Sequence, residues 1–330
     1  MLEKKRILSG MRPTGPLHLG NYHGALDNWV KLQDVYECFF FIADWHALTS
    51  DYENTGSIRE NITQMMIDWL SVGLSPEKCT LFVQSQIKEH AELFLLLSMI
   101  TPVPWLERNP TYKDQIVQLS NKDLSTFGFL GYPVLQAADI IIYRADIVPV
   151  GIDQVPHVEI TREIARRFNY LYGDVFPEPQ SLLTETPKIL GLDRRKMSKS
   201  YGNAIYLSDS PDQIRSKTAG MITDPQRARK SDPGNPDVCN VFEFHKLYSD
   251  GQLVSRVEAE CRTARIGCVE CKKLMAENLV AALHPIREKR DYYENHPDMV
   301  KNFIDEGCKR ATREARKTMT AVRDALKISF

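Results

Sequence analysis

The sequence predicts an α/β protein in which a Rossmann-like, doubly wound parallel sheet is followed by a second, all-helical domain. Three observations support this fold class. Short apolar runs alternate with helical patterns in the first half of the chain, glycines follow the first and last of these runs, and only helical patterns remain after Asp209. Strands that alternate with helices are typical of a parallel sheet covered by helices. With 330 residues, the chain is long enough for two domains.

The strands are predicted where apolar residues follow one another almost without a polar break. They are expected at Ile7-Leu8, 37–44 (ECFFFIAD), 79–83 and 146–151. Near-continuous apolar runs are typical of strands that are buried on both faces of a parallel sheet.

The helices are predicted where apolar residues recur every three or four positions. They are expected at 58–74, 89–100, 132–143, 158–171, 239–248, from 267 to about 293, and at about 305–326. Pro102 and Pro104 are expected to end the second of these helices. The polar segment 173–195 is predicted to be a surface connection.

The domain boundary is predicted near residues 200–210, where the strand and helix alternation stops. We expect residues 1–205 to form the sheet domain and 206–305 to form a helical domain. Residues 306–330 are expected to form a terminal helix that packs back toward the sheet domain.

Composition and charge exclude several classes of protein. The net charge of -1 argues against a protein that coats nucleic acid by bulk charge, and we expect no DNA partner. No apolar run approaches the ~18 residues of a membrane span, and the first residues lack the core of a signal peptide. The sequence therefore predicts a cytoplasmic protein. Eight basic against four acidic residues in 301–330 fit either a solvated helix face or contact with an RNA backbone.

The stretch 9–26 (SGMRPTGPLHLGNYHGAL) is predicted to be a strand end, a glycine-containing turn and a helix start. Such a junction points backbone N–H groups and the positive end of a helix dipole at one spot, and Gly20 allows close approach of a ligand. The stretch is therefore a candidate phosphate site, with a plain structural turn as the alternative.

A second motif, KMSKS, stands at residues 196–200 after the predicted sheet. HLGN (18–21) followed by KMSKS resembles the signature pair of the class I aminoacyl-tRNA synthetases. The resemblance implies amino-acid activation by ATP, in which positioning and neutralisation of negative charge supply the catalysis. It implies four catalytic residues: His18, Asn21, Lys196 and Lys199. Two solvated lysines in a linker are the alternative for the KMSKS loop.

The resemblance also implies the residues that contact ATP. These are Arg12, Pro13, Thr14, Gly20, Asn21, Gly151, Ile152, Asp153, Ile189, Lys196, Met197, Ser198, Lys199 and Ser200. Mg²⁺ is expected to accompany ATP, held by phosphates and water rather than by a protein cage. Relatives often carry Gln in place of Arg12, whose charge could contact a phosphate or pair with an acid.

Residues 132–143 and 146–169 resemble, more narrowly, the tryptophanyl-tRNA synthetases of bacterial type, and this similarity extends over the whole chain. It implies that Asp139 accepts the indole N–H and that Tyr132 and Gln154 hold the amino group of tryptophan. The full set of expected tryptophan contacts is Asp139, Tyr132, Gln136, Gln154, His46 and Leu8. The resemblance also implies tRNA(Trp) as a partner and a homodimer. It assigns catalysis to residues 1–205 and anticodon binding to residues 206–305.

Tyrosine is the alternative substrate, because the tyrosyl-tRNA synthetases share the fold and a similar Tyr-x-x-x-Gln-x-x-Asp helix. In those enzymes a tyrosine on the first strand meets the phenol hydroxyl, whereas Leu8 stands at that place here. An apolar wall with one acceptor suits an indole better than a phenol, which would lack a partner. Two further alternatives are a small nucleotidyltransferase and a non-enzymatic RNA-binding relative, which would not need both motifs.

Four of the seven cysteines lie within residues 239–271, spaced C-x21-C-x6-C-x2-C. They are Cys239, Cys261, Cys268 and Cys271. Thiolates in such a set suit Zn²⁺ or an iron-sulfur cluster. The spacing resembles that of some bacterial tryptophanyl-tRNA synthetases, which implies a 4Fe-4S cluster; Zn²⁺ and free thiols are the alternatives.

Overall fold

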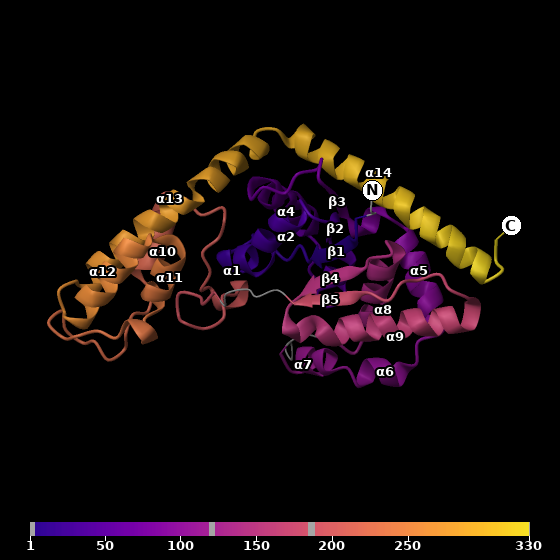
Figure 1. Ribbon diagram of the computed structural model, residues 1–330, viewed down its shortest axis with the longest axis horizontal. Helices are drawn as coiled ribbons and strands as arrows, with labels where there is room; N and C mark the ends of the chain where they lie inside the picture. Colours follow the sequence, from indigo (N-terminus) through magenta and orange to yellow (C-terminus); the bar gives the residue numbers. More distant parts are fainter. Residues whose placement is uncertain (1–3, 119–122, 184–188, 330) are drawn as a thin grey trace.

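The computed structural model describes residues 4–118, 123–183 and 189–329. Figure 1 shows an elongated, bent molecule with the sheet domain at one end and the helical domain at the other. Two long helices, α13 (Cys268–Glu294) and α14 (Pro297–Ala325), run along the top and connect the two ends. Among the described residues, no helix combines the length and the apolar character needed to cross a membrane.

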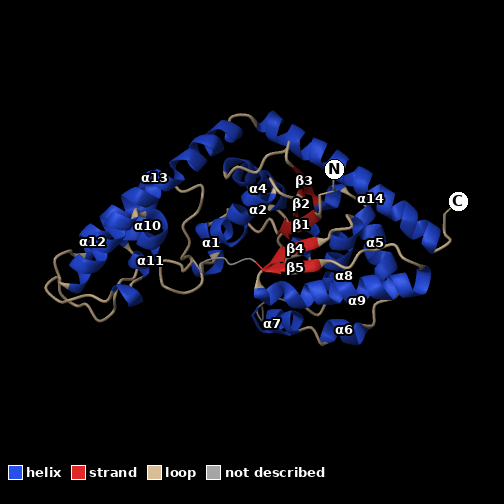
Figure 2. Cartoon of the chain, viewed as in Figure 1, coloured by secondary structure: helices blue, strands red, loops and turns tan. Residues whose placement is uncertain are grey.

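A five-stranded sheet in the order β3-β2-β1-β4-β5 forms the centre of the sheet domain, and every pair is parallel. The strands are β1 (Arg6–Met11), β2 (Glu37–Ile42), β3 (Cys79–Val83), β4 (Ile147–Val150) and β5 (Gln180–Leu183). Figure 2 shows these strands stacked between helices, which confirms the predicted doubly wound α/β fold.

The edge strand β5 was not predicted, because it lies within the segment expected to be a surface connection. Its two end residues are exposed and its two middle residues are half-buried, and it pairs only with β4. A strand with one neighbour and little burial does not need a continuous apolar run. The sequence signal on which the other strands were recognised is therefore missing there.

Successive side chains of the central strands enter two different hydrophobic cores. Phe40 and Ile42 pack on one face of the sheet, while Phe39 and Phe41 pack on the other. This follows from the two-residue period of a strand. Because β2 is apolar at both sets of positions, helices can cover both faces of the sheet.

The helices of the sheet domain are α1 (Leu19–Asn21), a π-helical turn (Tyr22–Leu26), α2 (Asp27–Leu32), α3 (Asp44–Leu48), α4 (Ile58–Ser71), α5 (Glu89–Ser98), α6 (Val103–Glu107), α7 (Pro110–Gln118), α8 (Phe127–Ile142) and α9 (Val155–Tyr172). Pro102 and Pro104 end one helix, as predicted, but they also begin α6. Proline suits the first turn of a helix, where its missing N–H leaves no bond unmade.

The helices that follow are α10 (Pro211–Ala219), α11 (Asn240–Tyr248), α12 (Gly251–Arg262), α13 and α14. Only helices occur after Asp209 in the described residues, as predicted. Helix α14 begins eight residues before the expected position 305 and packs against β3 and α5. Ala311, Ala315 and Met319 are fully buried in this contact.

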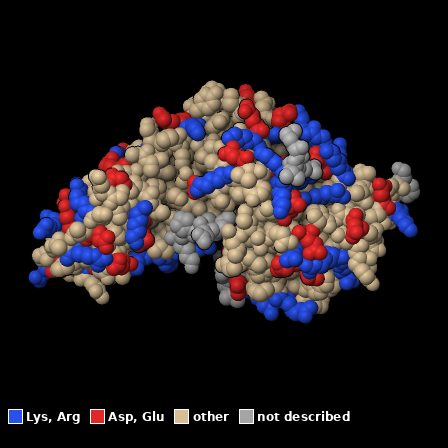
Figure 3. Space-filling view, in the orientation of Figure 1, with Lys and Arg blue, Asp and Glu red and all other residues tan. Residues whose placement is uncertain are grey.

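Much of the positive charge of α14 is paired with nearby carboxylates. Arg316 Nε lies 2.8 Å from Glu89 Oε1, and Arg323 Nε lies 2.7 Å from Glu92 Oε1 on α5. Lys317 also pairs with Glu314 of its own helix, at 2.7 Å. Figure 3 shows basic and acidic side chains side by side along this end of the molecule. The pairing favours a packed and solvated helix face over an RNA-binding one.

Candidate active site

The HLGN turn follows β1 and is closed by two reciprocal hydrogen bonds. His18 Nδ1 accepts the N–H of Asn21 at 3.3 Å, and Asn21 Oδ1 accepts the N–H of His18 at 3.0 Å. These bonds form a capping box at the start of α1. The predicted order of strand, turn and helix is therefore present, and its two polar side chains fix the helix start.

The KMSKS loop lies directly against this turn. Met197 Cβ would be 3.5 Å from a Cβ placed on Gly20, and Lys199 Nζ would be 3.4 Å from one placed on Gly15, whose φ is +124°. Two backbone bonds join the segments: Leu19 N–H donates to the Ile205 carbonyl at 2.9 Å, and Leu207 N–H donates to the Leu17 carbonyl at 2.9 Å. The fold thus brings the two motifs to one site.

The charges at this site are arranged for an anion. Burial, together with the charges of Lys199 and Lys196, lowers the pKa of His18 to about 4, so the ring is neutral at pH 7. Burial lowers the pKa of Lys199 to about 8, and the charge of Asp68 opposes this shift. The lysines therefore supply the positive charge beside the glycine turn, while His18 acts as a neutral polar group.

Asn203, which sequence reasoning missed, holds the KMSKS loop in shape. Its Oδ1 accepts the N–H of Ser198 at 2.9 Å. Its Nδ2 donates to Asp193 Oδ1 at 2.7 Å and to the Lys196 carbonyl at 3.3 Å. A signal was available, because asparagine at the end of a polar loop commonly bonds to the nearby backbone. Ser198 and Ser200 also join their hydroxyls, at 2.9 Å.

The remaining ATP candidates line the turn and the carboxyl ends of β1 and β4. Arg12 Nη1 donates to Ser50 Oγ at 3.2 Å, so its nearest partner is a hydroxyl rather than an acid. Pro13 is buried beside the exposed Thr14. Ile189 is also buried, and its carbonyl accepts the N–H of Met197.

After β4, the exposed Asp153 follows Gly151, where a Cβ would lie 2.7 Å from Asp153 Oδ1. Ile152 between them is 75% exposed. Gln154 Nε2 donates to Asp153 Oδ2 at 3.0 Å, so this expected tryptophan ligand contacts an expected ATP ligand instead. This segment stands at the carboxyl edge of the sheet, where ligands of open α/β sheets bind.

A second polar centre surrounds Asp139 of α8, which is fully buried. Asp139 Oδ2 accepts a bond from His46 Nε2 at 2.8 Å, and Asp139 Oδ1 accepts one from His90 Nδ1 at 2.6 Å. Gln84 Nε2 lies 2.8 and 2.9 Å from the two carboxylate oxygens. Burial alone would raise the pKa of Asp139, but the bonds and charges of the two histidines bring it below its usual value. The carboxylate is therefore ionised.

Sequence reasoning missed Gln84 and His90. Gln84 directly follows β3 at the carboxyl edge of the sheet, which is the position that marks ligand-facing residues in this kind of fold. That signal was available. His90 lies in the apolar helix α5, and no sequence pattern distinguishes it from a core histidine.

Tyr132 of α8 contacts a different histidine from the two that bond to Asp139. Its hydroxyl is 3.2 Å from His157 Nε2, and His157 Nδ1 is 3.1 Å from Asn109 Nδ2. Burial lowers the pKa of His157 to about 4. Gln136 is half-buried one turn before Asp139.

Leu8 of β1 is 2% exposed and packs in the same hydrophobic core as the apolar residues of α8. Its role as an apolar wall of a tryptophan pocket stays a prediction.

Three of the four clustered cysteines gather around two side chains of the helical domain. Arg227 Nη1 lies 3.9 Å from Cys261 Sγ and 3.8 Å from Cys268 Sγ, and Cys271 Sγ lies 3.5 Å from His245 Nε2. Burial first, and then the other thiols, raise the pKa of Cys271 to about 12.

Cys239, the fourth of these cysteines, is buried directly before α11. All four thiols are free, and the described residues contain no group of three or more His, Cys, Asp or Glu arranged to hold a metal ion. The structure therefore does not support the predicted metal site.

A parallel sheet with an HLGN turn and a KMSKS loop in contact defines a class I tRNA synthetase. The family model described as tRNA synthetases class I (W and Y) matches residues 2–284. Because this match covers most of the chain, the chain belongs to this family.

Comparison with individual relatives shows which group within this family the chain belongs to. A tryptophan--tRNA ligase of Thermotoga maritima is 54% identical over 327 residues, covering 98% of this chain and 100% of the relative. One of Aquifex aeolicus is 49% identical, with coverage of 98% and 100%. The crystal structure of tryptophanyl-tRNA synthetase from Campylobacter jejuni complexed with ADP and tryptophane superposes with a TM-score of 0.90 at 33% identity, covering 98% and 99%. Within the class I family, the chain is thus a member of the tryptophan-tRNA ligases.

Proposed function

We propose that the chain activates L-tryptophan with ATP and transfers it to the 3' end of tRNA(Trp). The observation that carries this function is the contact between the two motifs, which sets Lys199 beside Gly15 at the turn after β1. A backbone turn and a cation on opposite sides of one site suit a polyphosphate. Because tRNA is charged in the cytoplasm, the proposed activity also favours that location.

In the first step, a carboxylate oxygen of tryptophan attacks the α-phosphorus of ATP, the bond to the bridging oxygen breaks, and pyrophosphate leaves. Lys196 and Lys199 neutralise the charge that develops on the leaving group. His18 is neutral, so it donates or accepts a hydrogen bond without adding charge. Asp153 suits a ribose hydroxyl. Mg²⁺ bound to the phosphates would supply further charge neutralisation.

In the second step, a ribose hydroxyl at the 3' end of the tRNA attacks the carbonyl carbon of the adenylate. The ester forms, and AMP leaves with the bond electrons. The attacking hydroxyl loses its proton to the departing phosphate or to water. The chain's own part is to hold the adenylate, through the HLGN turn and the segment after β4.

The indole is recognised by Asp139 in this proposal. A carboxylate offers about four acceptor positions, and the histidines and Gln84 occupy them in the structure. The side chain of His46 is 12% exposed, whereas that of His90 is fully buried. The indole N–H therefore takes the position of His46 on Oδ2, and His90 and Gln84 stay in place.

ATP-pyrophosphate exchange with each of the twenty amino acids tests the proposal. We expect exchange with tryptophan and at least 100-fold less with tyrosine, because Leu8 offers no hydrogen bond to a phenol hydroxyl. Exchange with tyrosine alone would contradict the assignment of substrate, and no exchange with any amino acid would contradict the function.

We also propose that two copies of the chain associate through exposed apolar side chains of α5, α6 and the residues next to them. Leu95 is 55% exposed, Met99 71%, Val103 49% and Phe127 71%, and these residues come from α5, α6 and the start of α8. Patches of this kind mark protein interfaces. Met99→Lys should convert dimers to monomers in sedimentation, whereas Tyr170→Lys, on the exposed face of α9, should not. A monomeric unmodified chain would refute the proposal.

We propose, finally, that the four clustered thiols hold a 4Fe-4S cluster, with Zn²⁺ as the alternative. Supporting this, the thiols lie close enough to raise one another's pKa, a repulsion that a bound cation relieves. Iron, sulfide and zinc analysis of anaerobically purified protein tests the site, with Cys308→Ser as the control. Absence of all three would leave four free thiols.

A further inference from the structure

One buried ion pair joins the helical domain to the sheet domain behind the HLGN turn. Arg290 Nη1 of α13 donates to Asp68 Oδ1 of α4, and the two side chains are 8% and 2% exposed. Arg290 Nη2 donates to Gln64 Oε1 and, at 2.9 Å, to Glu294 Oε1. The guanidinium is therefore held by groups from both domains.

The second oxygen of Asp68 contacts the turn itself. Asp68 Oδ2 accepts the N–H of Leu17 at 3.4 Å, and Leu17 directly precedes His18. The Leu17 carbonyl accepts the N–H of Leu207, which follows the KMSKS loop. The charge of Asp68 also acts on Lys199, whose pKa it raises. The Asp68 carboxylate thus connects α13 with the HLGN turn, and its charge also acts on Lys199 of the KMSKS loop.

A second contact supports the same connection from another side. His23 of the π-helical turn lies 2.6 Å, Nε2 to hydroxyl, from Tyr248 of α11. The π-helical turn starts directly after Asn21, and such turns are frequent at functional sites. The helical domain therefore contacts the HLGN region at two places. Arg290 reaches the residue before the turn through Asp68, and Tyr248 reaches the π-helical turn after it through His23.

We propose that Asp68 and Arg290 are positioning residues for ATP: the ion pair fixes the backbone at Leu17 and thereby the placement of His18 and Gly20. This inference rests on the proposed function. A buried ion pair gives little stability over a packed apolar pair, because both charges lose their hydration. Its geometric value is that Asp68 serves two partners in fixed directions, which an apolar residue cannot do.

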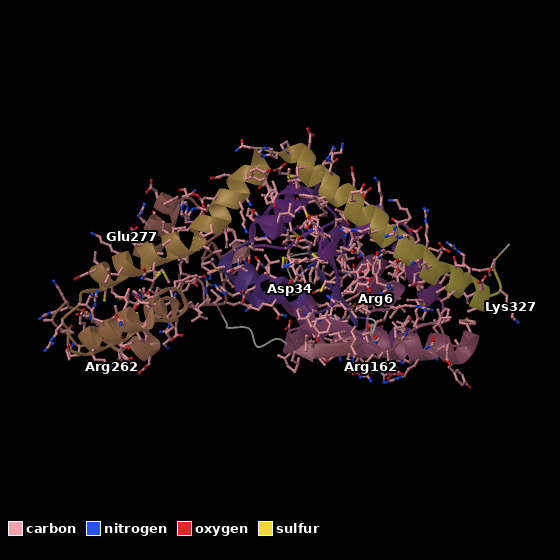
Figure 4. All side chains as sticks on the ribbon, turned by 45° about the horizontal axis from the view of Figure 1, so that its top comes forward. Arg6, Asp34, Arg162, Arg262, Glu277 and Lys327 are labelled. Atoms are coloured by element: carbon pink, nitrogen blue, oxygen red, sulfur yellow. The ribbon has the colours of Figure 1, made fainter. Side chains whose placement is uncertain are left out.

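ATP affinity and thermal stability of the full chain test this inference. The variants are Asp68→Asn, Arg290→Met and the double variant, with Glu277→Gln as the control. Glu277 also lies on α13 and makes two bonds to Arg215, at 2.7 and 3.0 Å, but it is exposed and lies on the helical domain in Figure 4. ATP binding is measured by titration calorimetry without tryptophan, and KM values are measured by pyrophosphate exchange.

Asp68→Asn should weaken ATP binding about three- to ten-fold and raise the KM for ATP by the same factor, with the KM for tryptophan unchanged within two-fold. The double variant should regain much of the thermal stability lost by each single one, because no unpaired charge stays buried. Its ATP affinity should stay low, because the amide oxygen of asparagine can still accept the Leu17 N–H but no ion pair fixes its direction. Glu277→Gln should change neither affinity.

A double variant that regains both stability and ATP affinity would show a merely structural pair and overturn the inference. So would unchanged ATP affinity in Asp68→Asn. If Asp68→Asn does not fold, Arg290→Lys decides the question, because lysine keeps the positive charge. An ATP affinity of Arg290→Lys between those of the unmodified chain and Arg290→Met supports positioning. If Arg290→Lys and Arg290→Met both bind ATP like the unmodified chain, the inference is contradicted. ATP binding without tryptophan separates this inference from the proposed function, whose failure appears as absent exchange in the unmodified chain.

Discussion

His90 lies between Asp139 and Tyr143, with Nδ1 2.6 Å from Asp139 Oδ1 and Nε2 2.7 Å from the Tyr143 hydroxyl. Burial raises the pKa of Tyr143 well above its usual value, so the phenol keeps its proton and donates it to Nε2. His90 then carries its own proton on Nδ1 and donates it to Asp139. Tyr143 therefore helps to orient, through His90, the carboxylate that we assign to tryptophan.

Replacing Asp139 by Asn should impair tryptophan selection without affecting ATP. The amide keeps the shape of the side chain but loses the charge and turns a donor toward His46 or His90. A charged hydrogen bond contributes about 1.5–3 kcal/mol, so kcat/KM for tryptophan in pyrophosphate exchange should fall about 10- to 150-fold. ATP binding by calorimetry is the control. A variant with full exchange activity would contradict the assigned role.

The activation rate should fall on the alkaline side as Lys199 loses its proton. A lysine whose pKa is lowered to about 8 is charged below that pH and neutral above it. If the charge on Lys199 neutralises the leaving pyrophosphate, kcat/KM for ATP in exchange should decrease as pH rises through about 8, because kcat/KM reports the pKa of the enzyme without bound ATP. In Lys199→Arg this limb should disappear, since arginine stays charged. An alkaline limb at the same pH in the arginine variant would assign it to another group.

Acid should destabilise the fold in part through His157. Burial and the charge of His46 lower its pKa from 6.5 to about 4. Between these values the unfolded chain binds a proton that the folded chain does not, so the free energy of unfolding falls as pH falls. This group contributes up to about 3 kcal/mol of that loss. His157→Gln, measured by denaturant unfolding at pH 7 and 4, should show a smaller decrease than the unmodified chain.

Gly307→Ala should loosen the contact between α14 and the sheet. A Cβ at Gly307 would overlap the Leu81 carbonyl of β3. Overpacking of this kind costs about 1–3 kcal/mol, and the thermal midpoint should drop accordingly. Gly251→Ala is the matched control, because Gly251 begins α12 and a Cβ there meets no atom within 4 Å. That variant should be neutral or slightly stabilised. Equal effects in both would show that α14 adapts.

The fold could be predicted from the sequence where an element is buried, because a buried element needs a recognisable run of apolar residues. The strand 79–83 coincides with β3, because all its side chains are buried. The edge strand β5 carries no such pattern. The meeting of the two motifs was likewise predictable, since each one is a contiguous stretch.

The partners of individual side chains were harder to predict. Asp139 was singled out, but Gln84 and His90 reach it from separate elements, and nothing local to them reports that contact. Cysteine spacing predicted that the thiols would gather. It could not predict that Arg227 and His245 would lie beside three of them.

The backbone bonds from Leu19 to Ile205 and from Leu207 to Leu17 have a consequence for the entropy of binding. They fasten the far side of the KMSKS loop to the HLGN turn, and Asn203 bonds the loop internally. A loop already ordered in this way loses few conformations when ATP arrives. The interaction energy of the lysines with phosphate is then not offset by the free-energy cost of ordering the chain, and more of it is left to lower the barrier to adenylate formation.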